Sequence, residues 1–143
     1  MPARRSALLI ATYRYEDATL RQLTAPARDA EALADTLRNP EIADFDVTIL
    51  VNEPYHIILQ AIGEFYNNRR RDDLTLLYFT GHGLKDDQGR LYLATTNTKR
   101  DRLLFTGLSA HCVSSTASRS SAMSVLRFSR STPYSLAKIS RFS

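Results

Sequence analysis

One histidine stands between two glycines, directly after a strongly apolar stretch. The run Leu74–Phe79 leads into Thr80-Gly81-His82-Gly83. A neutral imidazole can accept a proton from a thiol or protonate a leaving amine near pH 7. The glycines leave the backbone bare, which permits close approach of a substrate and exposes a backbone N–H that can bind an oxyanion. His82 is therefore a candidate general base; the alternative is a histidine that merely occupies a turn.

The elements that would hold His82 follow from the spacing of apolar residues. Continuous apolar or β-rich runs predict strands over 7–12, 45–52 and 74–81. Helical spacing of apolar residues predicts helices from Pro26 to Arg38 and from about Pro54 onward, and 84–95 has the pattern of a hairpin. Alternating strands and helices predict an α/β fold with a mostly parallel sheet, whose strands end at one common edge. Such folds place their chemistry at that edge, where His82 would lie facing the loop after the first strand.

Several segments resemble the caspase-like cysteine peptidases of bacteria, which are relatives of caspases and metacaspases. In chain order they are SALLIATYRYED, APARDAEALADTLRNPEIADFDVTILVNEP, DDLTLLYFTGHGLKDDQGRLYLATTNT and LLFTGLSA. The resemblance covers about residues 6 to 110. It implies a three-layer α/β/α sandwich of the caspase type, incomplete at its C-terminal side, and hydrolysis of peptide bonds through a Cys-His dyad.

The same resemblance assigns roles to individual residues. His82 matches the dyad histidine, and the Gly83 N–H would help bind the oxyanion of the tetrahedral intermediate. Asp29 falls where metacaspases carry an aspartate that lines the pocket for the residue before the cleaved bond. A carboxylate there favours Arg or Lys in the substrate, whereas the structural alternative makes Asp29 an early-helix acid that is favourable to the helix dipole. The loop after the first strand borders this pocket in the family and here contains Tyr13, Arg14 and Tyr15.

A dyad needs a thiol, and the chain has one cysteine. In caspases the histidine lies roughly 50 residues before the cysteine, and counting forward from His82 leads to the region near Ser131, where no cysteine is found. The nearest apolar run, Ser124–Phe128, is interrupted by Arg127. Cys112 follows His82 by only 30 residues, and its neighbours predict no strand that would aim it. We therefore expect the chain to lack the nucleophile and to have little or no peptidase activity.

The composition changes at about residue 110. Residues 1–110 contain 14 Lys or Arg and 15 Asp or Glu, whereas 111–143 contain five basic residues, no acid and eleven serines. The net charge of +4 therefore belongs to the tail, while the body of the domain is close to neutral. These counts assign 1–110 to the N-terminal part of a caspase-like catalytic domain and 111–143 to a Ser/Arg-rich tail, frameshifted or disordered. Without a strand beyond the third, the sheet would keep an open apolar edge.

The same sequence limits which partners, cofactors and cellular locations are expected. The single cysteine rules out an internal disulfide framework and agrees with a cytoplasmic location. No apolar run approaches the roughly 18 residues of a membrane span. We expect a protein or peptide substrate, neither a membrane nor a nucleic-acid partner, and no cofactor. Calcium stays open as an alternative, because some caspase relatives need it and Asp86 and Asp87 place two carboxylates in one loop.

Three other functions remain as alternatives. A non-catalytic relative of the peptidases would keep the fold as an interaction or regulatory module. A nucleotide-binding domain is disfavoured, because neither a Gly-x-Gly-x-x-Gly motif nor a P-loop follows the first strand. The basic tail could bind RNA weakly through phosphate contacts.

Overall fold

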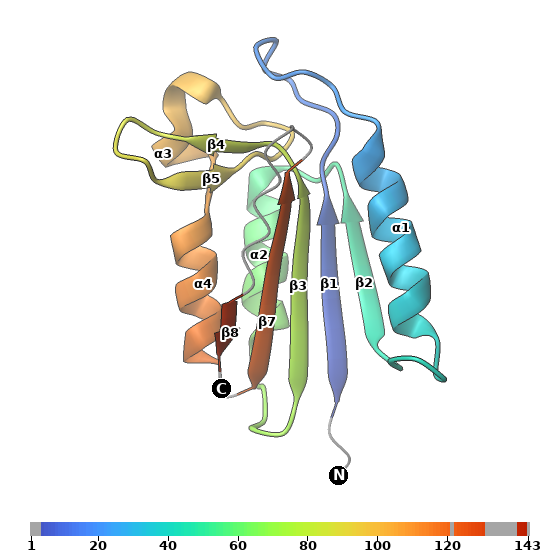
Figure 1. Ribbon diagram of the computed structural model, residues 1–143. Coiled ribbons are helices and arrows are strands. Elements are labelled where there is room, and N and C mark those ends of the chain that lie inside the picture. Colours follow the sequence, from blue (N-terminus) through green and yellow to red (C-terminus); the bar gives the residue numbers. More distant parts are fainter. Residues whose placement is uncertain (1–3, 121, 131–139, 143) are drawn as a thin grey trace.

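The computed structural model describes residues 4–120, 122–130 and 140–142 and is built around one five-stranded sheet (Figure 1). In spatial order its strands are β2 (Asp46–Val51), β1 (Arg5–Ala11), β3 (Leu74–Gly81), β7 (Met123–Arg130) and β8 (Ser140–Phe142). The first four are parallel, and β8 is antiparallel to β7. The prediction of an α/β fold with a mostly parallel, open sheet is confirmed.

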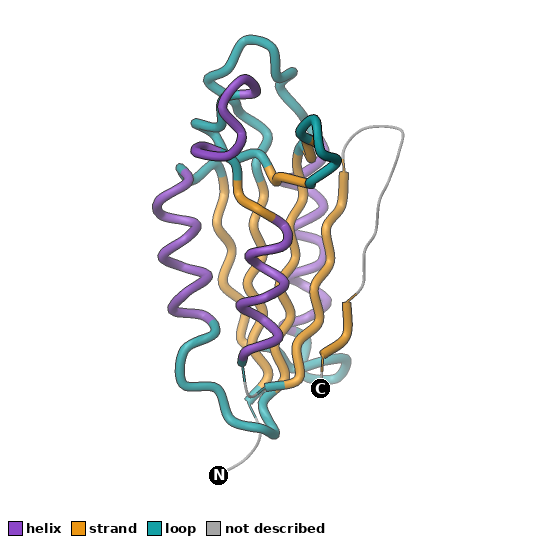
Figure 2. The backbone as a smooth tube through the Cα atoms, turned by 90° about the vertical axis from the view of Figure 1, so that its left-hand side faces the viewer, coloured by secondary structure: helices purple, strands orange, loops and turns teal. Residues whose placement is uncertain are grey.

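Helices cover both faces of this sheet, which gives three layers. Helix α1 (Ala25–Arg38) lies on one face, over β1 and β2, whereas α2 (Tyr55–Phe65) and α4 (Ala110–Arg119) lie on the other (Figures 1 and 2). The first helix predicted from the sequence, Pro26–Arg38, agrees with α1 to within one residue at each end. Among the described residues, no helix combines the length and apolar character that crossing a membrane requires.

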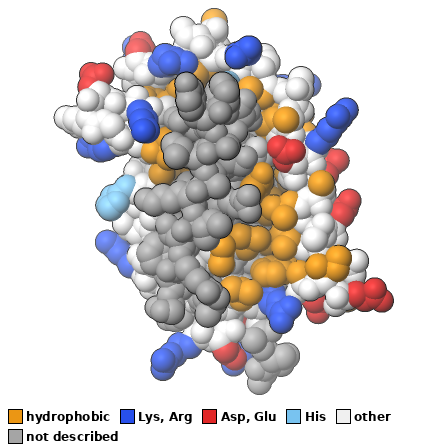
Figure 3. All heavy atoms as spheres, in the orientation of Figure 1, with side chains coloured by type: hydrophobic (Ala, Val, Ile, Leu, Met, Phe, Trp, Pro, Cys, Tyr) orange, Lys and Arg blue, Asp and Glu red, His pale blue; other side chains and the backbone are white. Residues whose placement is uncertain are grey.

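Each helix faces the sheet with a narrow apolar stripe. On α1 the stripe consists of the buried residues Ala30, Ala34 and Leu37. Ala34 and Leu37 pack in one cluster with Ala7 and Leu9 of β1. Helical spacing of these residues places them on one side of the helix, as the amphipathic pattern requires. Figure 3 shows apolar side chains beside the grey atoms, mainly on their right, on the molecular face that is viewed in Figure 1, with most charged side chains toward the edges of this face. Burial of the stripe therefore fixes α1 on β1 and β2.

The central strand β3 is buried from both sides. Leu77 and Phe79 point into the cluster that contains Ile58 and Ile62 of α2, whereas Tyr78 belongs to the cluster under α1. Alternate residues of a strand point to opposite faces, so a continuous apolar run suits a strand covered on both sides. The residues that follow β3 therefore leave from a rigid support.

A second, smaller sheet lies at the C-terminal edge of the large one. Its strands have the order β4-β5-β6 and are antiparallel, and two short helices lie close to it (Figure 1). The elements of this region are β4 (Gly83–Lys85), β5 (Leu91–Leu93), η1 (Arg100–Arg102), α3 (Leu103–Thr106) and β6 (Leu108–Ser109). The hairpin predicted after His82 is thus present as β4 and β5.

Strand β7 lies beside β3, where the sequence had predicted an open sheet edge. It pairs with β3 over the full length of that strand, from Leu74 opposite Met123 to Gly81 opposite Arg130. The prediction of an open sheet edge beside β3 was therefore wrong. Sheet pairing uses backbone N–H and C=O groups, which any non-proline residue supplies, so the interrupted apolar pattern did not prevent it. The described residues after 110 form most of α4 and all of β7 and β8.

Candidate active site

His82 lies at the C-terminal edge of the sheet, between the end of β3 and the start of β4. Its side chain is 8% exposed, so the imidazole is held inside the protein surface. Gly81 makes this approach possible: its φ is +157°, and a Cβ atom there would lie 2.9 Å from the Thr12 carbonyl oxygen. The backbone of β3 thus passes so close to the end of β1 that only a glycine fits before the histidine.

One nitrogen of the imidazole is committed to a backbone carbonyl. His82 Nε2 lies 2.7 Å from the carbonyl oxygen of Arg21, in the loop between β1 and α1. A carbonyl oxygen can only accept, so Nε2 carries the hydrogen in this contact. In the neutral ring the lone pair then belongs to Nδ1, and no described residue forms a hydrogen bond with that atom. The geometry therefore leaves Nδ1 as the nitrogen that can take up a proton.

Tyr15 contacts both the ring and the backbone of His82. The two ring centroids are 4.8 Å apart with an interplanar angle of 49°. The Tyr15 hydroxyl accepts a hydrogen bond from the His82 backbone N–H at 2.9 Å and donates one to the Thr12 carbonyl at 2.8 Å. Burial raises the pKa of Tyr15 to about 12, against a smaller opposing effect of the His82 N–H. The phenol therefore remains protonated and able to donate at neutral pH.

The loop between β1 and α1, which carries the Arg21 carbonyl, is anchored by hydrogen bonds to Asp17. Asp17 accepts hydrogen bonds from the backbone N–H of Arg100, at 2.8 Å, and from Thr19. These bonds, that of Arg100 being the strongest, lower the pKa of Asp17 to about 2. Leu20 is 2% exposed and packs beside Leu84 in the cluster under this loop. The acceptor for His82 is thus preceded in the loop by two anchored residues, Asp17 and Leu20.

Arg14 lies beside this arrangement in a cavity of about 530 Å³. The cavity is lined by Tyr13, Arg14, Tyr15, Glu16, Gln22, Leu23 and Thr96. The Arg14 guanidinium carbon lies 5.6 Å from the centre of the Tyr13 ring. The side-chain oxygen of Asn52 accepts the backbone N–H groups of Tyr13 and Arg14, at 3.0 and 3.1 Å. Arg14 and Tyr15 thus line one cavity, and Tyr15 is also in contact with His82, which is not among the lining residues.

Asp29 and Gly83 occupy different surroundings. Asp29 is exposed on α1 and is not one of the residues that line the cavity at Arg14. It is the fifth residue of that helix, and the first turn contains no acid. Gly83 begins β4 and is paired with Leu93 of β5. The functional roles of both residues stay predictions from the resemblance.

The position expected for a nucleophile lies at the end of β7. This strand ends at Arg130, which pairs with Gly81 of β3. Gly81 directly precedes His82 in the chain. Ser131, where counting along the chain placed the missing cysteine, lies outside the described residues. Cys112 is exposed near the start of α4 and lines a separate cavity of about 730 Å³, together with Tyr55 and Tyr92. His82 is not among the residues that line this second cavity, so the two groups are not brought together.

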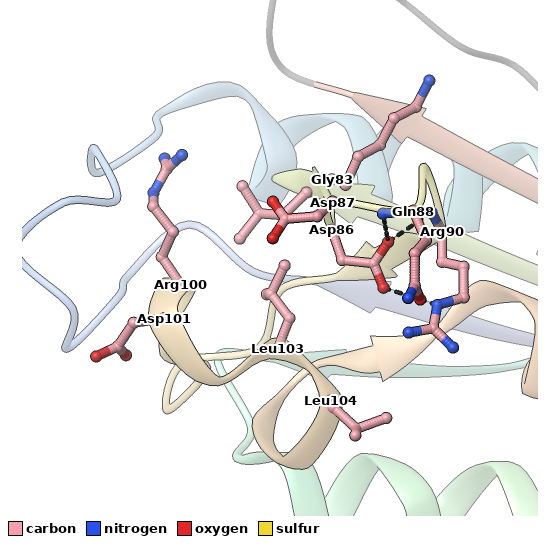
Figure 4. A pocket seen from close by; sticks show the side chains of 11 residues that line it. Gly83, Asp86, Asp87, Gln88, Arg90, Arg100, Asp101, Leu103 and Leu104 are labelled. Carbon is pink, nitrogen blue, oxygen red and sulfur yellow. Dashed lines mark hydrogen bonds and ion pairs between the residues drawn. The ribbon is translucent and has the colours of Figure 1, made fainter.

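The two carboxylates considered for calcium border a third cavity, of about 710 Å³, between the β4–β5 hairpin and α3 (Figure 4). Both oxygens of Asp86 are engaged inside the hairpin. One accepts the backbone N–H groups of Gln88 and Arg90, and the other lies 2.7 Å from Arg90 Nε. In the described part of the chain, no group of three or more Asp, Glu, His or Cys side chains is arranged to hold a metal ion.

Two elements of the site were not found by sequence reasoning. The Arg21 carbonyl has no side-chain signature, because every residue has the same backbone oxygen. The side chain of Gln22 binds the backbone of Tyr15, and a single glutamine in a loop carries no periodic signal. The one available indication was Leu20, an apolar residue within a polar loop, which marks the point where this loop is anchored.

Comparison with known proteins agrees with this geometry. The family model of the caspase domain matches residues 4–123. The structure of pro-sf-caspase-1 has a TM-score of 0.71 at 15% identity, covering 94% of this chain and 53% of its own. Caspase-1 from Spodoptera frugiperda has a TM-score of 0.69 at 17% identity, covering 90% of this chain and 47% of its own.

A bacterial structure, protein GSU0716 from Geobacter sulfurreducens, has a TM-score of 0.70 at 16% identity and covers 89% of this chain and 50% of its own. The chain thus spans about half the length of these solved structures. No curated protein matches it significantly in sequence. The likeness to the solved structures reflects the shared fold, and the match to the family model over most of the sequence shows that the chain belongs to the caspase-domain family of peptidases.

Proposed function

We propose that this chain carries the histidine half of a cysteine-peptidase site, with His82 as the general base. The observation that supports this most directly is the contact between His82 Nε2 and the Arg21 carbonyl, at the sheet edge where β3 and β7 end. Because that contact fixes the hydrogen on Nε2, Nδ1 keeps the lone pair that a base requires.

The reaction would follow the usual sequence for acyl transfer to a thiol. Nδ1 accepts the thiol proton, and the thiolate attacks the carbonyl carbon of the peptide bond. The carbonyl oxygen becomes an oxyanion, which the Gly83 N–H would stabilise. The imidazolium then gives its proton to the leaving amine, and water hydrolyses the thioester with the imidazole again as base. The substrate of such a reaction is a protein or peptide. The proposed location of the protein is the cytoplasm.

The thiol is missing where this reaction needs it. The one cysteine of the sequence, Cys112, lies on α4 and lines a cavity in which His82 is not among the lining residues. We therefore propose that the chain is inactive as a peptidase in its present form. A measurable cleavage of peptides after Arg or Lys, abolished in His82→Ala, would contradict this.

The basicity of His82 can be tested without peptide cleavage. In a Cys112→Ser background, Ser131→Cys places a thiol directly after β7. We expect iodoacetamide to alkylate this thiol about tenfold faster at neutral pH than in the same protein with His82→Ala, because a base that accepts the thiol proton increases the fraction of reactive thiolate. Circular dichroism of both proteins serves as the control for folding. Equal alkylation rates in two folded proteins would remove the support for His82 as the base.

Substrate preference rests on Asp29 and Arg14. Asp29 would favour a basic side chain before the cleaved bond, because opposite charges attract and like charges are excluded. Arg14 lines the cavity beside Tyr15 and would contact the substrate there. Fusing residues 1–123 to the downstream half of a bacterial relative would give a protein in which cleavage after Arg or Lys can be measured. Asp29→Asn should reduce cleavage after basic residues more than cleavage after neutral ones.

A second candidate function is favoured by one observation, the absence of a cysteine from the sequence of β7. A caspase-type domain without its nucleophile can still bind peptides as an interaction or regulatory module. Binding of fluorescent basic peptides without cleavage, measured by anisotropy and weakened by Asp29→Asn, would support this role.

The origin of residues 111–143 is a separate proposal. A change of reading frame near codon 111 would explain the loss of acidic residues and the increase in serine. Translation of the other two frames of the gene should then recover an apolar strand that ends in Asp-Cys-Cys or a similar segment. If neither frame contains one, the tail is a genuine Ser/Arg-rich sequence.

A further inference from the structure

Tyr15 contacts His82, and Gln22, in the same loop, is hydrogen-bonded to the backbone of Tyr15. Tyr15 is 6% exposed, with its hydroxyl between the Thr12 carbonyl and the His82 N–H. Neither the resemblance to caspase-like peptidases nor the cavity at Arg14 accounts for the presence of these two hydrogen bonds. A hydroxyl that bridges the ends of two parallel strands fixes their relative position, because each bond constrains one backbone group.

Gln22 connects this tyrosine to the acceptor of the imidazole. Its side-chain oxygen accepts the Tyr15 backbone N–H at 2.9 Å, and its side-chain nitrogen donates to the Tyr15 carbonyl at 2.9 Å. Gln22 directly follows Arg21, whose carbonyl oxygen accepts from His82 Nε2. The contacts therefore form a closed ring, which runs from Tyr15 to His82, to Arg21, to Gln22 and back to Tyr15.

We propose that Tyr15 and Gln22 are positioning residues for His82, which hold the Nε2 hydrogen on the Arg21 carbonyl and thereby keep the lone pair on Nδ1. The proposal rests on the proposed role of His82 as a general base. Tyr15 acts on the backbone and ring of the histidine, and Gln22 acts on the loop that supplies the acceptor. Neither side chain takes part in the proton transfer.

The competing explanation is that Tyr15 only fills space. Its ring packs in a cluster with Leu20, Leu84 and Leu103, and a purely apolar role would be preserved by phenylalanine. Tyr15→Phe keeps the ring and removes the hydroxyl, so it separates the two explanations. Gln22→Met keeps the length of the side chain and removes both of its hydrogen bonds.

The test uses the full chain and follows the Nε2 hydrogen of His82 by ¹⁵N-edited NMR. A ring hydrogen that is bonded to a carbonyl exchanges slowly with water, and we expect exchange about tenfold faster in Tyr15→Phe and in Gln22→Met, which corresponds to the net contribution of roughly one hydrogen bond. Tyr55→Phe is the matched control, because no described residue hydrogen-bonds the hydroxyl of this half-buried tyrosine. Its Nε2 exchange should equal that of the unaltered protein.

A general loss of stability is distinguished by a second measurement in the same samples. Exchange of the backbone N–H of Phe79, a buried residue of β3, reports opening of the sheet. Faster exchange at His82 with unchanged exchange at Phe79 supports positioning. Unchanged exchange at His82, or an increase in proportion to that at Phe79, overturns it. The alkylation experiment can fail independently of this one, so failure of the proposed function remains distinguishable.

Discussion

Gly81 is the residue on which the approach of β3 to the end of β1 depends. A Cβ atom there would lie 2.9 Å from the Thr12 carbonyl oxygen and 3.0 Å from the Tyr15 hydroxyl. Both neighbours belong to the hydrogen bonds that surround His82. The conformation of one glycine is therefore coupled to the geometry of the candidate base.

At this position, alanine should destabilise the protein. We expect Gly81→Ala to lower the free energy of unfolding by about 2 kcal/mol or more, because the methyl group must displace backbone and the φ angle disfavours side chains. Gly63→Ala is the matched control: Gly63 lies in α2 with no atom within 4 Å of an added Cβ. That substitution should raise the free energy of unfolding by about 0.5–1 kcal/mol. Guanidinium unfolding measures both, and equal effects would contradict the role given to Gly81.

Among the elements, β7 extends the sheet beside β3, the strand that leads directly into His82. It pairs with β3 over its full length, and the Thr75 hydroxyl lies 2.9 Å from that of Ser124 between the two strands. Both residues are fully buried. The edge of β3 is therefore protected by a strand from the serine-rich part of the sequence.

Removal of this strand should abolish cooperative folding. A chain that ends at Ser120 exposes the apolar edge of β3, and such an edge pairs readily with other chains. We expect the shortened protein to elute as aggregates in size-exclusion chromatography and to lose its cooperative thermal transition by circular dichroism. A monomeric protein with an unchanged transition would show that β7 is dispensable.

The elements also show how far the sequence predicts this fold. Strands β1 and β3 were predictable, because each is a continuous apolar run buried on both faces. Strand β7 was missed, since Arg127 breaks the apolar run and the pairing uses only backbone groups. His82 was found from its glycine neighbours, but the Arg21 carbonyl was not, because this contact joins residues 61 positions apart without any side-chain pattern on the acceptor.

For the whole molecule, two carboxylates connect segments that are distant in the chain. Asp73, at the start of β3, accepts hydrogen bonds from the backbone and side chain of Arg4, before β1. The N–H of Arg70 and then these bonds lower the pKa of Asp73 to about 2. Asp17 joins the loop after β1 to η1 and has a pKa lowered to about 2 as well. Both ends of the central strands are thus held by ionised groups.

These groups predict how stability depends on pH. In the unfolded chain an aspartate has a pKa near 4, roughly. A lower value in the folded state stabilises the fold above that pH, and the contribution is lost as pH falls toward 2. We expect the free energy of unfolding, measured in urea, to decrease between about pH 4 and 2. The double variant Asp17→Asn, Asp73→Asn should be less stable at pH 7 and should show a shallower decrease; an identical slope would contradict the assignment.

The acceptor of the His82 hydrogen is a main-chain oxygen, and this limits the ways in which it can be lost. Exchanging Arg21 for another amino acid leaves that oxygen in place. Inserting or deleting a single residue between Tyr15 and Gln22 moves it away from the imidazole. Over evolutionary time, the number of residues in this loop should therefore be under stronger selection than the identity of residue 21.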